Sequence, residues 1–257
     1  MDPILRLPVL RDNYIFVLLE QGSNRAAVVD PAVAGPVQEL LEQRGLELVV
    51  VLQTHHHSDH IGGTPELLQR WPEAEVWAAE SDRLRIPFLT RGLQHGDRLN
   101  LLGRAVEVIA VPGHTRDHIA YYLPELGGQG PELFCGDTLF AGGCGRLFEG
   151  SPAQMLNSLG LLAALPAPTR VWCAHEYTEN NLRFALSVDA NNAALQQRWQ
   201  RVKSQRELGQ ATVPSSIGLE LATNPFLRCG EPALRQATGV LEPAAVLAEV
   251  RRRKDHF

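Results

Sequence analysis

Short apolar runs separated by polar turns occupy the first two thirds of the chain, and they predict a series of β-strands. Turn-forming residues follow several of them, such as Asp30-Pro31 and Pro112-Gly113. Their shortness and their branched or aromatic side chains favour strands over helices. The predicted strands cover residues 14–19, 26–29, 48–52, 76–78, 106–111, 119–123, 133–135 and 171–174.

Apolar residues at helical spacing predict helices, and these dominate the last third of the chain. Gly45 fits a helix C-terminus, and Ser151 followed by Pro152 fits a helix N-terminus. Residues 214–225 are predicted to be a loop, and residues 81–103 contain turn signals without a clear element. The predicted helices cover residues 37–44, 65–71, 151–165, 178–188, 193–208 and 243–255.

This change of pattern predicts an α+β protein with two domains. Strands and helices share residues 1–166, whereas residues 167–257 are mainly helical. We place the boundary near Pro166–Pro168. The strand that ends at His175 is an exception, because we expect it to pack with the first domain and to bring His175 to its functional site.

Composition narrows the classes of partner. A net charge of −5 over 257 residues gives no indication of nucleic acid or an anionic membrane as a partner. No apolar run is long enough to span a bilayer, and Met1-Asp2-Pro3-Ile4 lacks the features of a signal peptide. The cysteines form no Cys-x-x-Cys pair, which favours reduced thiols in a cytoplasmic protein. They are Cys135, Cys144, Cys173 and Cys229.

The sequence Thr-His-His-His-Ser-Asp-His at residues 54–60 follows an apolar strand and precedes a predicted helix. His55 and His57 are two apart, so in extended backbone they point the same way and can bind one ion. Asp59 and His60 are then expected to serve a second position. Imidazole and carboxylate ligands suit zinc, iron or manganese. His56 points to the opposite side and is predicted to be exposed or structural.

A residue of a type that binds metals also follows each of three other predicted strands. These residues are His114, Asp137 and His175. Active sites are usually assembled from loops at one edge of a rigid scaffold. Seven candidate ligands are too many for one tetrahedral ion but suit two ions that share a carboxylate and a water. We expect Asp137 to lie between the ions. The first ion is assigned His55, His57 and His114, and the second Asp59, His60 and His175.

The motif at residues 54–60, together with Gly113-His114-Thr115, Gly136-Asp137 and His175, resembles the metallo-β-lactamase superfamily. The motifs occur in the usual order and cover the first two thirds of the chain. The resemblance implies a four-layer αββα sandwich with a two-metal site at one edge and, for this chain, a C-terminal all-helical domain.

A narrower resemblance covers essentially the whole chain. The segments at residues 143–146, 174–178, 224–226 and 251–255 are similar to glyoxalase II, the hydroxyacylglutathione hydrolases. That family hydrolyses S-D-lactoylglutathione to D-lactate and glutathione, the second step of methylglyoxal detoxification. One departure is Arg146-Leu147-Phe148, where some members have Lys-Phe-Tyr. The resemblance implies substrate contacts from Arg146, Phe148, His175, Tyr177, Arg251 and Lys254.

The expected chemistry is attack on the thioester carbonyl by a hydroxide that bridges two divalent metals, with zinc favoured over iron or manganese. Asp59 and Asp137 are the expected catalytic carboxylates. The thiolate is a good leaving group, so no general acid is required. The partner is a small glutathione thioester, and a monomer is expected.

Three alternative functions remain open from sequence. A persulfide dioxygenase shares the fold and the opening motif but uses one iron. Another superfamily hydrolase, acting on lactams, lactones or RNA, is the second, and a metal-binding module without catalysis is the third. Serine hydrolysis has no support, because the chain has no Gly-x-Ser-x-Gly elbow.

Overall fold

The computed structural model describes residues 3–257, which form two compact units. Unit 1 runs to Ala110 and includes Asp117–Leu126. Unit 2 comprises Val111–Arg116 and Gly127–Phe257. Met1 and Asp2, which belong to the stretch used to argue against a signal peptide, lie outside the described residues. No helix within residues 3–257 is long and apolar enough to cross a membrane.

A six-stranded sheet forms the framework of unit 1, with its strands in chain order. The first three strands are antiparallel, and β3 to β6 are parallel. The carboxyl ends of β3 and β4 therefore lie at one edge of the sheet. The strands are β1 (Ile4–Val9), β2 (Asn13–Leu19), β3 (Arg25–Val29), β4 (Glu47–Leu52), β5 (Glu75–Ala79) and β6 (Arg91–Leu93).

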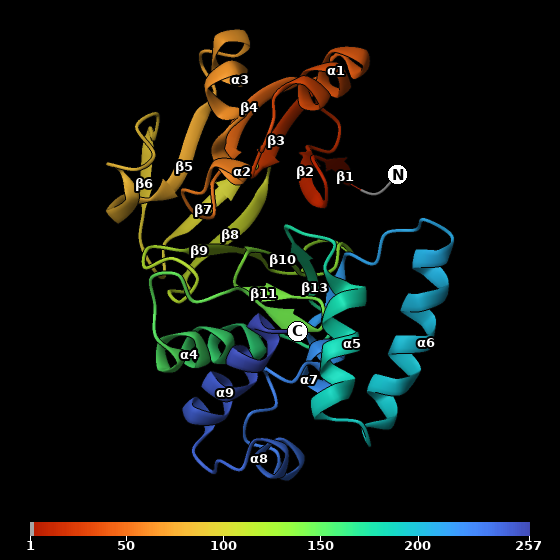
Figure 1. The fold of residues 1–257 in the computed structure, drawn as a ribbon. Helices are drawn as coiled ribbons and strands as arrows, with labels where there is room; N and C mark the ends of the chain where they lie inside the picture. Colours follow the sequence, from red (N-terminus) through yellow and green to blue (C-terminus); the bar gives the residue numbers. More distant parts are fainter. Residues whose placement is uncertain (1–2) are drawn as a thin grey trace. The chain divides into compact units, whose positions relative to one another are not determined.

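Two helices, α1 (Gly35–Arg44) and α3 (Thr64–Arg70), cover one face of this sheet (Figure 1). Val37 and Leu41 of α1 and Leu67 of α3 are fully buried in the cluster that they form with the strands. Gly45 ends α1 in the left-handed conformation, with φ of 61°, as predicted. A short helix, α2 (Ser58–Ile61), lies in the connection after β4.

The other face of the sheet packs against an antiparallel group of strands, β7 (Arg98–Leu101), β8 (Arg104–Ala110) and β9 (Ile119–Leu123). The buried hydroxyl of Tyr121 on β9 donates hydrogen bonds to the carbonyls of Gln53 and Trp77, both at 2.9 Å. The amide of Ile119 donates to the carbonyl of Thr54 at 3.0 Å. These bonds tie the start of the histidine-rich segment to β9.

Unit 2 is built on two parallel strands, β10 (Glu132–Gly136) and β13 (Arg170–Cys173). The short strand β14 (Ser215–Ser216) pairs antiparallel with β13. A small hairpin, β11 (Leu139–Phe140) and β12 (Gly143–Cys144), follows β10. Asp137 and His175 follow the parallel strands β10 and β13, so both residues emerge at the same edge.

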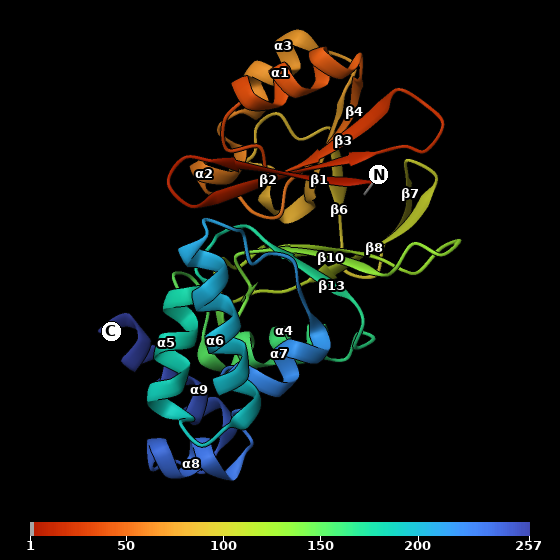
Figure 2. The same ribbon diagram turned by 90° about the vertical axis from the view of Figure 1, so that its right-hand side faces the viewer.

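Six helices complete the described part of unit 2. Helix α4 begins at a Ser151–Gln154 capping box with Pro152 in its first turn, as the sequence predicts. Helices α5 and α6 lie side by side and antiparallel (Figures 1 and 2), with Leu182 and Leu195 buried between them. The helices are α4 (Pro152–Ala163), α5 (Thr178–Val188), α6 (Ala193–Glu207), α7 (Ile217–Thr223), α8 (Pro232–Thr238) and α9 (Pro243–Asp255).

The predicted loop at residues 214–225 was wrong, because most of it is helix α7 with a capped N-terminus. The Ser216 hydroxyl accepts a hydrogen bond from the amide of Leu219, and Ile217 and Thr223 are buried. Prolines on both sides and a length of only seven residues, about two turns, hid the apolar spacing of this helix. Residues 81–103, left without elements, contain a 3₁₀ turn at Glu80–Asp82 and strands β6 and β7.

A buried ion pair joins α6 to α7. The guanidinium of Arg198 lies 2.5 Å from the carboxylate of Glu220, and both side chains are almost fully buried. The second oxygen of Glu220 accepts from the amide of Gly142 at 2.8 Å and from the side chain of Asn224 at 3.0 Å. Asn224 also donates to the carbonyl of Gly143. The helices thus fix the β11–β12 turn.

Removing this carboxylate is expected to leave Arg198 buried and uncompensated. We expect Glu220→Ala to lower the free energy of unfolding by about 3–5 kcal/mol, measured by urea denaturation. The matched control is Glu207→Ala, because Glu207 is exposed and its ion pair with Lys203 is long, at 4.0 Å. That change should cost less than about 1 kcal/mol. Equal losses in the two variants would contradict the structural role of the buried pair.

Candidate metal centre

Unit 1 brings four of the predicted ligands together after β4. Nε2 of His55 and Nδ1 of His57 are 3.0 Å apart. Ligand atoms of His55 and His60, and of Asp59 and His60, lie within 4.8 Å of each other. The backbone turns into α2 at Ser58, so Asp59 and His60 sit on a helical turn while His55 and His57 precede it. Because of this change from extended to helical backbone, the side chains of His55 and His57 leave the chain in a different direction from those of Asp59 and His60.

Asp30, at the end of β3, orients this group and was not recognised from the sequence. Its carboxylate accepts from the amide of Thr54 at 2.8 Å and from the Thr54 hydroxyl at 2.7 Å. The same carboxylate lies 3.0 Å from Nδ1 of His60. A carboxylate partner on Nδ1 directs the opposite ring nitrogen towards a metal. Asp30 has φ of 49°, a costly conformation for a residue with a side chain.

Two further residues outside the predicted set support the ligands of unit 1. The side-chain amide of Asn13 donates to the Asp59 carbonyl at 3.1 Å and to its carboxylate at 3.2 Å. The imidazole of His118 stacks on His55, with ring centroids 4.6 Å apart and planes 17° apart. His118 is buried, and its Nδ1 lies 3.1 Å from the carbonyl of Ile119. Both contacts restrict ligand side chains.

His56 has structural partners, as one of the two sequence alternatives predicts. Its Nδ1 lies 3.5 Å from the buried carboxylate of Asp82. Arg85 pairs with Asp82 and donates to Asp117 at 2.8 Å. Burial raises the pKa of Asp82, although its hydrogen bond to Arg85 opposes the shift. The network holds the residue between His55 and His57 in place.

Unit 2 brings together the other three predicted ligands. One carboxylate oxygen of Asp137 lies 3.5 Å from Nε2 of His114, and the other lies 3.2 Å from Nε2 of His175. In the chain, His114 follows β8, Asp137 follows β10 and His175 follows β13. A carboxylate that presents one oxygen to each of two imidazoles has the arrangement expected of a bridging ligand.

The segment that follows β12 orients His114. Nδ1 of His114 lies 2.9 Å from the carbonyl of Arg146, and the amide of Phe148 donates to the His114 carbonyl at 3.3 Å. The Nδ1 contact again points Nε2 at the ligand position. Gly145 must be glycine, because a Cβ there would lie well inside contact with the Asp137 carbonyl and 3.1 Å from Nδ1 of His114.

The donors fit divalent metal ions. Each unit supplies imidazole nitrogens beside a carboxylate, the ligand types that zinc, iron and manganese take in proteins. His60 and His114 each have a partner on Nδ1 that fixes the ring, a feature of metal-binding histidines. A site without metals needs neither imidazoles grouped beside a carboxylate nor a fixed partner on Nδ1, and here the same histidines have both.

The residues predicted to contact substrate differ in exposure. Tyr177 stacks on His175 with centroids 4.8 Å apart and an angle of 2° between planes. The side chains of Arg146 and Phe148 are exposed. Lys254 donates to the Asn180 carbonyl at 3.1 Å. Burial, helped by the nearby cations Arg251, Arg183 and Arg146, lowers the pKa of Lys254 to about 8.

The four cysteines are buried and free. Burial raises the pKa of Cys144 to about 11 and those of Cys173 and Cys229 to about 12. The pKa of Cys135 is also raised well above its usual value, mainly by burial. These thiols stay protonated at neutral pH, so they act as apolar core groups.

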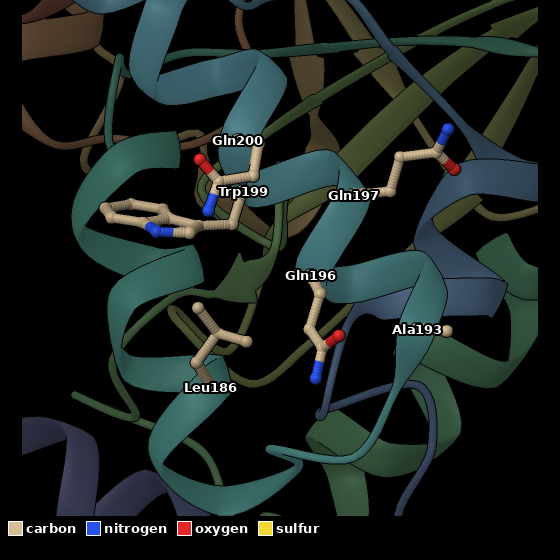
Figure 3. Close-up of a pocket in the computed structure, with 6 residues that line it drawn as sticks. All are labelled: Leu186, Ala193, Gln196, Gln197, Trp199 and Gln200. Carbon is tan, nitrogen blue, oxygen red and sulfur yellow. The ribbon is translucent and has the colours of Figure 1, made fainter.

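A pocket of about 500 Å³ lies between α5 and α6, and none of the predicted metal ligands lines it (Figure 3). Leu186 and Trp199 contribute its apolar surface, and Gln196 and Gln200 contribute amides. Its lining contains no ionisable side chain. This pocket therefore offers no group for proton transfer or metal binding.

Two family models together cover the chain from residue 11 to its end. The model of the metallo-beta-lactamase superfamily matches residues 11–175. The model of the hydroxyacylglutathione hydrolase C-terminus matches residues 176–257. The sequence resemblance is therefore confirmed over both parts of the chain.

Close relatives match over their full length. A hydroxyacylglutathione hydrolase from Synechococcus sp. (strain JA-3-3Ab) is 57% identical over 254 residues, which cover 99% of each sequence. A relative of the same name from Trichodesmium erythraeum (strain IMS101) is 54% identical over 255 residues, again 99% of each sequence.

Solved structures confirm the fold. The BLEG-1 B3 metallo-beta-lactamase matches with a TM-score of 0.66 and 21% identity, covering 87% of this chain and 99% of that chain. TTHA1623, in a di-iron-bound form, matches with a TM-score of 0.60 and 25% identity over the same shares. The chain has the predicted α+β fold, a metallo-β-lactamase sandwich followed by a helical C-terminal region.

A side chain at position 145 is expected to disturb two ligands in unit 2. We expect Gly145→Ala to lower zinc affinity by about tenfold or more, because outer contacts of a ligand contribute at least that much. Chelator competition with the metal-free protein measures this. Gly160→Ala is the control, since open space surrounds that helical position. It should bind zinc normally and gain about 0.5–1 kcal/mol of stability. Unchanged zinc affinity in Gly145→Ala would contradict the crowding argument.

Proposed function

The chain belongs to the hydroxyacylglutathione hydrolase family of the metallo-β-lactamase superfamily, and from this we propose that it hydrolyses S-D-lactoylglutathione to D-lactate and glutathione. The reaction is the second step of methylglyoxal detoxification. The observation that supports the chemistry most directly is the Asp137 carboxylate, which faces His114 with one oxygen and His175 with the other.

As a member of this family, with imidazole and carboxylate clusters in both units, the chain binds divalent metal. The proposal is that it binds two ions, with zinc favoured by the mixed nitrogen and oxygen donors. Asp137 is the proposed shared ligand. The proposed first set is His55, His57 and His114, and the proposed second set is Asp59, His60 and His175.

Bound metals would supply a hydroxide at neutral pH and would polarise the thioester carbonyl. Asp59 is the proposed residue that orients the attacking oxygen, and Asn13 holds its carboxylate in place. Asp30 and the Arg146 carbonyl keep His60 and His114 in one ring orientation. The product thiolate leaves without protonation by the chain, because a thiolate is a stable leaving group.

The proposed substrate contacts come from the loop after β12 and from the helical region. Tyr177 lies against His175, where its hydroxyl can bond the peptide part of glutathione. Arg146, Arg251 and Lys254 provide positive charge for the two carboxylates of glutathione. Phe148 offers an apolar surface only. Residues 1–166 are the proposed catalytic domain, and residues 167–257 the proposed substrate-binding domain.

Location and assembly are also part of the proposal. Four buried thiols without a disulfide in residues 3–257 support a reducing compartment, the cytoplasm. We propose a monomer that acts on a small molecule and binds neither nucleic acid nor membrane.

The deciding experiment is hydrolysis of S-D-lactoylglutathione, followed as loss of thioester absorbance. The zinc-loaded protein should turn over rapidly, and both chelation and Asp137→Ala should reduce kcat/KM by at least about a hundredfold. No hydrolysis by a protein that holds two metals would overturn the substrate assignment. Oxygen consumption with glutathione persulfide and a single bound iron would favour the dioxygenase alternative.

The low pKa of Lys254 predicts that substrate binding weakens in mild alkali. Lysine loses its charge as pH rises through about 8, so KM should increase by up to about tenfold between pH 7 and pH 9. The control is Lys254→Arg, because arginine keeps its charge over that range. The variant should show a flat KM over the same pH interval. Parallel KM profiles in the two proteins would remove Lys254 from the binding site.

A further inference from the structure

Arg251 and Lys254 lie three residues apart on α9, yet their surroundings differ. The side chain of Arg251 is 8% exposed, and its guanidinium lies 5.3 Å from the ring centroid of Phe226. Lys254 is half-buried, and its ammonium lies near the rings of Phe184 and Phe257. The burial of Arg251 therefore points to a role for its guanidinium in addition to the positive charge that it shares with Lys254.

The hydrogen bonds of Arg251 are directed at the protein itself. Nη1 donates to the carbonyl of Cys144 at 2.9 Å. Nε donates to one carboxylate oxygen of Asp255 at 3.1 Å, and Nη2 forms an ion pair with the same oxygen at 2.9 Å. Asp255, four residues along the helix, thus fixes the plane of the guanidinium and leaves Nη1 pointing at Cys144.

Cys144 begins the segment that orients a metal ligand. The next residue, Gly145, lies against Asp137 and His114 with no room for a side chain. The residue after it, Arg146, places its carbonyl 2.9 Å from Nδ1 of His114. The carbonyl that Arg251 holds and the carbonyl that orients His114 are therefore only two residues apart in the chain.

We propose that Arg251 is a positioning residue for the metal centre, which it serves by holding the Cys144 carbonyl and so the orientation of His114. This inference rests on the proposed metal-binding role of His114 and not on the identity of the thioester. A buried charged donor contributes more to a carbonyl than an exposed one. The ammonium of Lys254, by contrast, donates to the carbonyl of Asn180 in α5.

The test measures metal binding without substrate. Metal-free protein is titrated with cobalt(II), and its affinity and visible absorption spectrum are recorded. Arg251→Met is expected to lower cobalt affinity by about tenfold and to change the spectrum, because His114 loses its fixed orientation. Arg251→Lys should recover part of both, since an ammonium can reach one carbonyl.

Matched variants separate this role from substrate binding and from general destabilisation. Arg252→Met removes an exposed cation that bonds to Glu249, and it should leave cobalt binding unchanged. Lys254→Met should raise KM but keep the wild-type spectrum. Asp255→Asn, at a partly exposed position, keeps Arg251 and should give an intermediate loss of affinity with little change in thermal unfolding.

Wild-type cobalt affinity and spectrum in both Arg251→Met and Asp255→Asn would overturn the inference. If Arg251→Met does not fold, Asp255→Asn decides together with Arg146→Met, because Arg146 lies 3.6 Å from the same Asp255 oxygen. A wild-type spectrum in Asp255→Asn, or an equal shift in both variants, would overturn the inference. Failure of the wild-type protein to hydrolyse S-D-lactoylglutathione, with cobalt binding intact, would count against the proposed substrate and not against this role of Arg251.

Discussion

The bonds of the Asp30 carboxylate are the constraint on which the histidine-rich segment depends. Parallel pairing places the ends of β3 and β4 at one edge of the sheet, so a carboxylate after β3 can reach the backbone after β4. It accepts from Thr54 and lies against His60, which fixes both ends of the turn that carries His55 and His57. The left-handed backbone of Asp30 costs about 1–3 kcal/mol, and three contacts to one carboxylate offset that cost.

The two units prepare their ligands by different means. Unit 1 uses a buried carboxylate and a stacked imidazole to hold its rings, whereas unit 2 uses a backbone carbonyl and a turn with no space for a side chain. Each set is ordered by contacts inside its own unit. The Glu220 and Asn224 side chains extend this in unit 2, because they fix the β11–β12 turn, which comes just before Gly145 in the chain. The buried polar side chains at this helix therefore help to hold the hairpin that leads to Gly145 and Arg146.

The elements and ligands that the sequence predicted best share one property, a local signal. The strand before His55 is a continuous apolar run, and Ser151-Pro152 is a helix start, so both could be read without tertiary information. Asp30 could not be recognised, because it looks like an ordinary turn residue until β3 and β4 are known to be neighbours. Helix α7 was missed because it is only seven residues long and lies between Pro214 and Pro225, and because one of its three buried side chains is the charged Glu220.

The buried cysteines have a consequence for the chemistry of the product. Hydrolysis of a glutathione thioester releases a thiol at every turnover, close to any cysteine near the site. Exchange with glutathione disulfide requires an accessible thiolate. Cys144 lies one residue from the ligand loop, but burial raises its pKa to about 11, and the other three thiols are equally shielded. The chain can therefore work in a changing glutathione redox balance without its cysteines exchanging with glutathione disulfide.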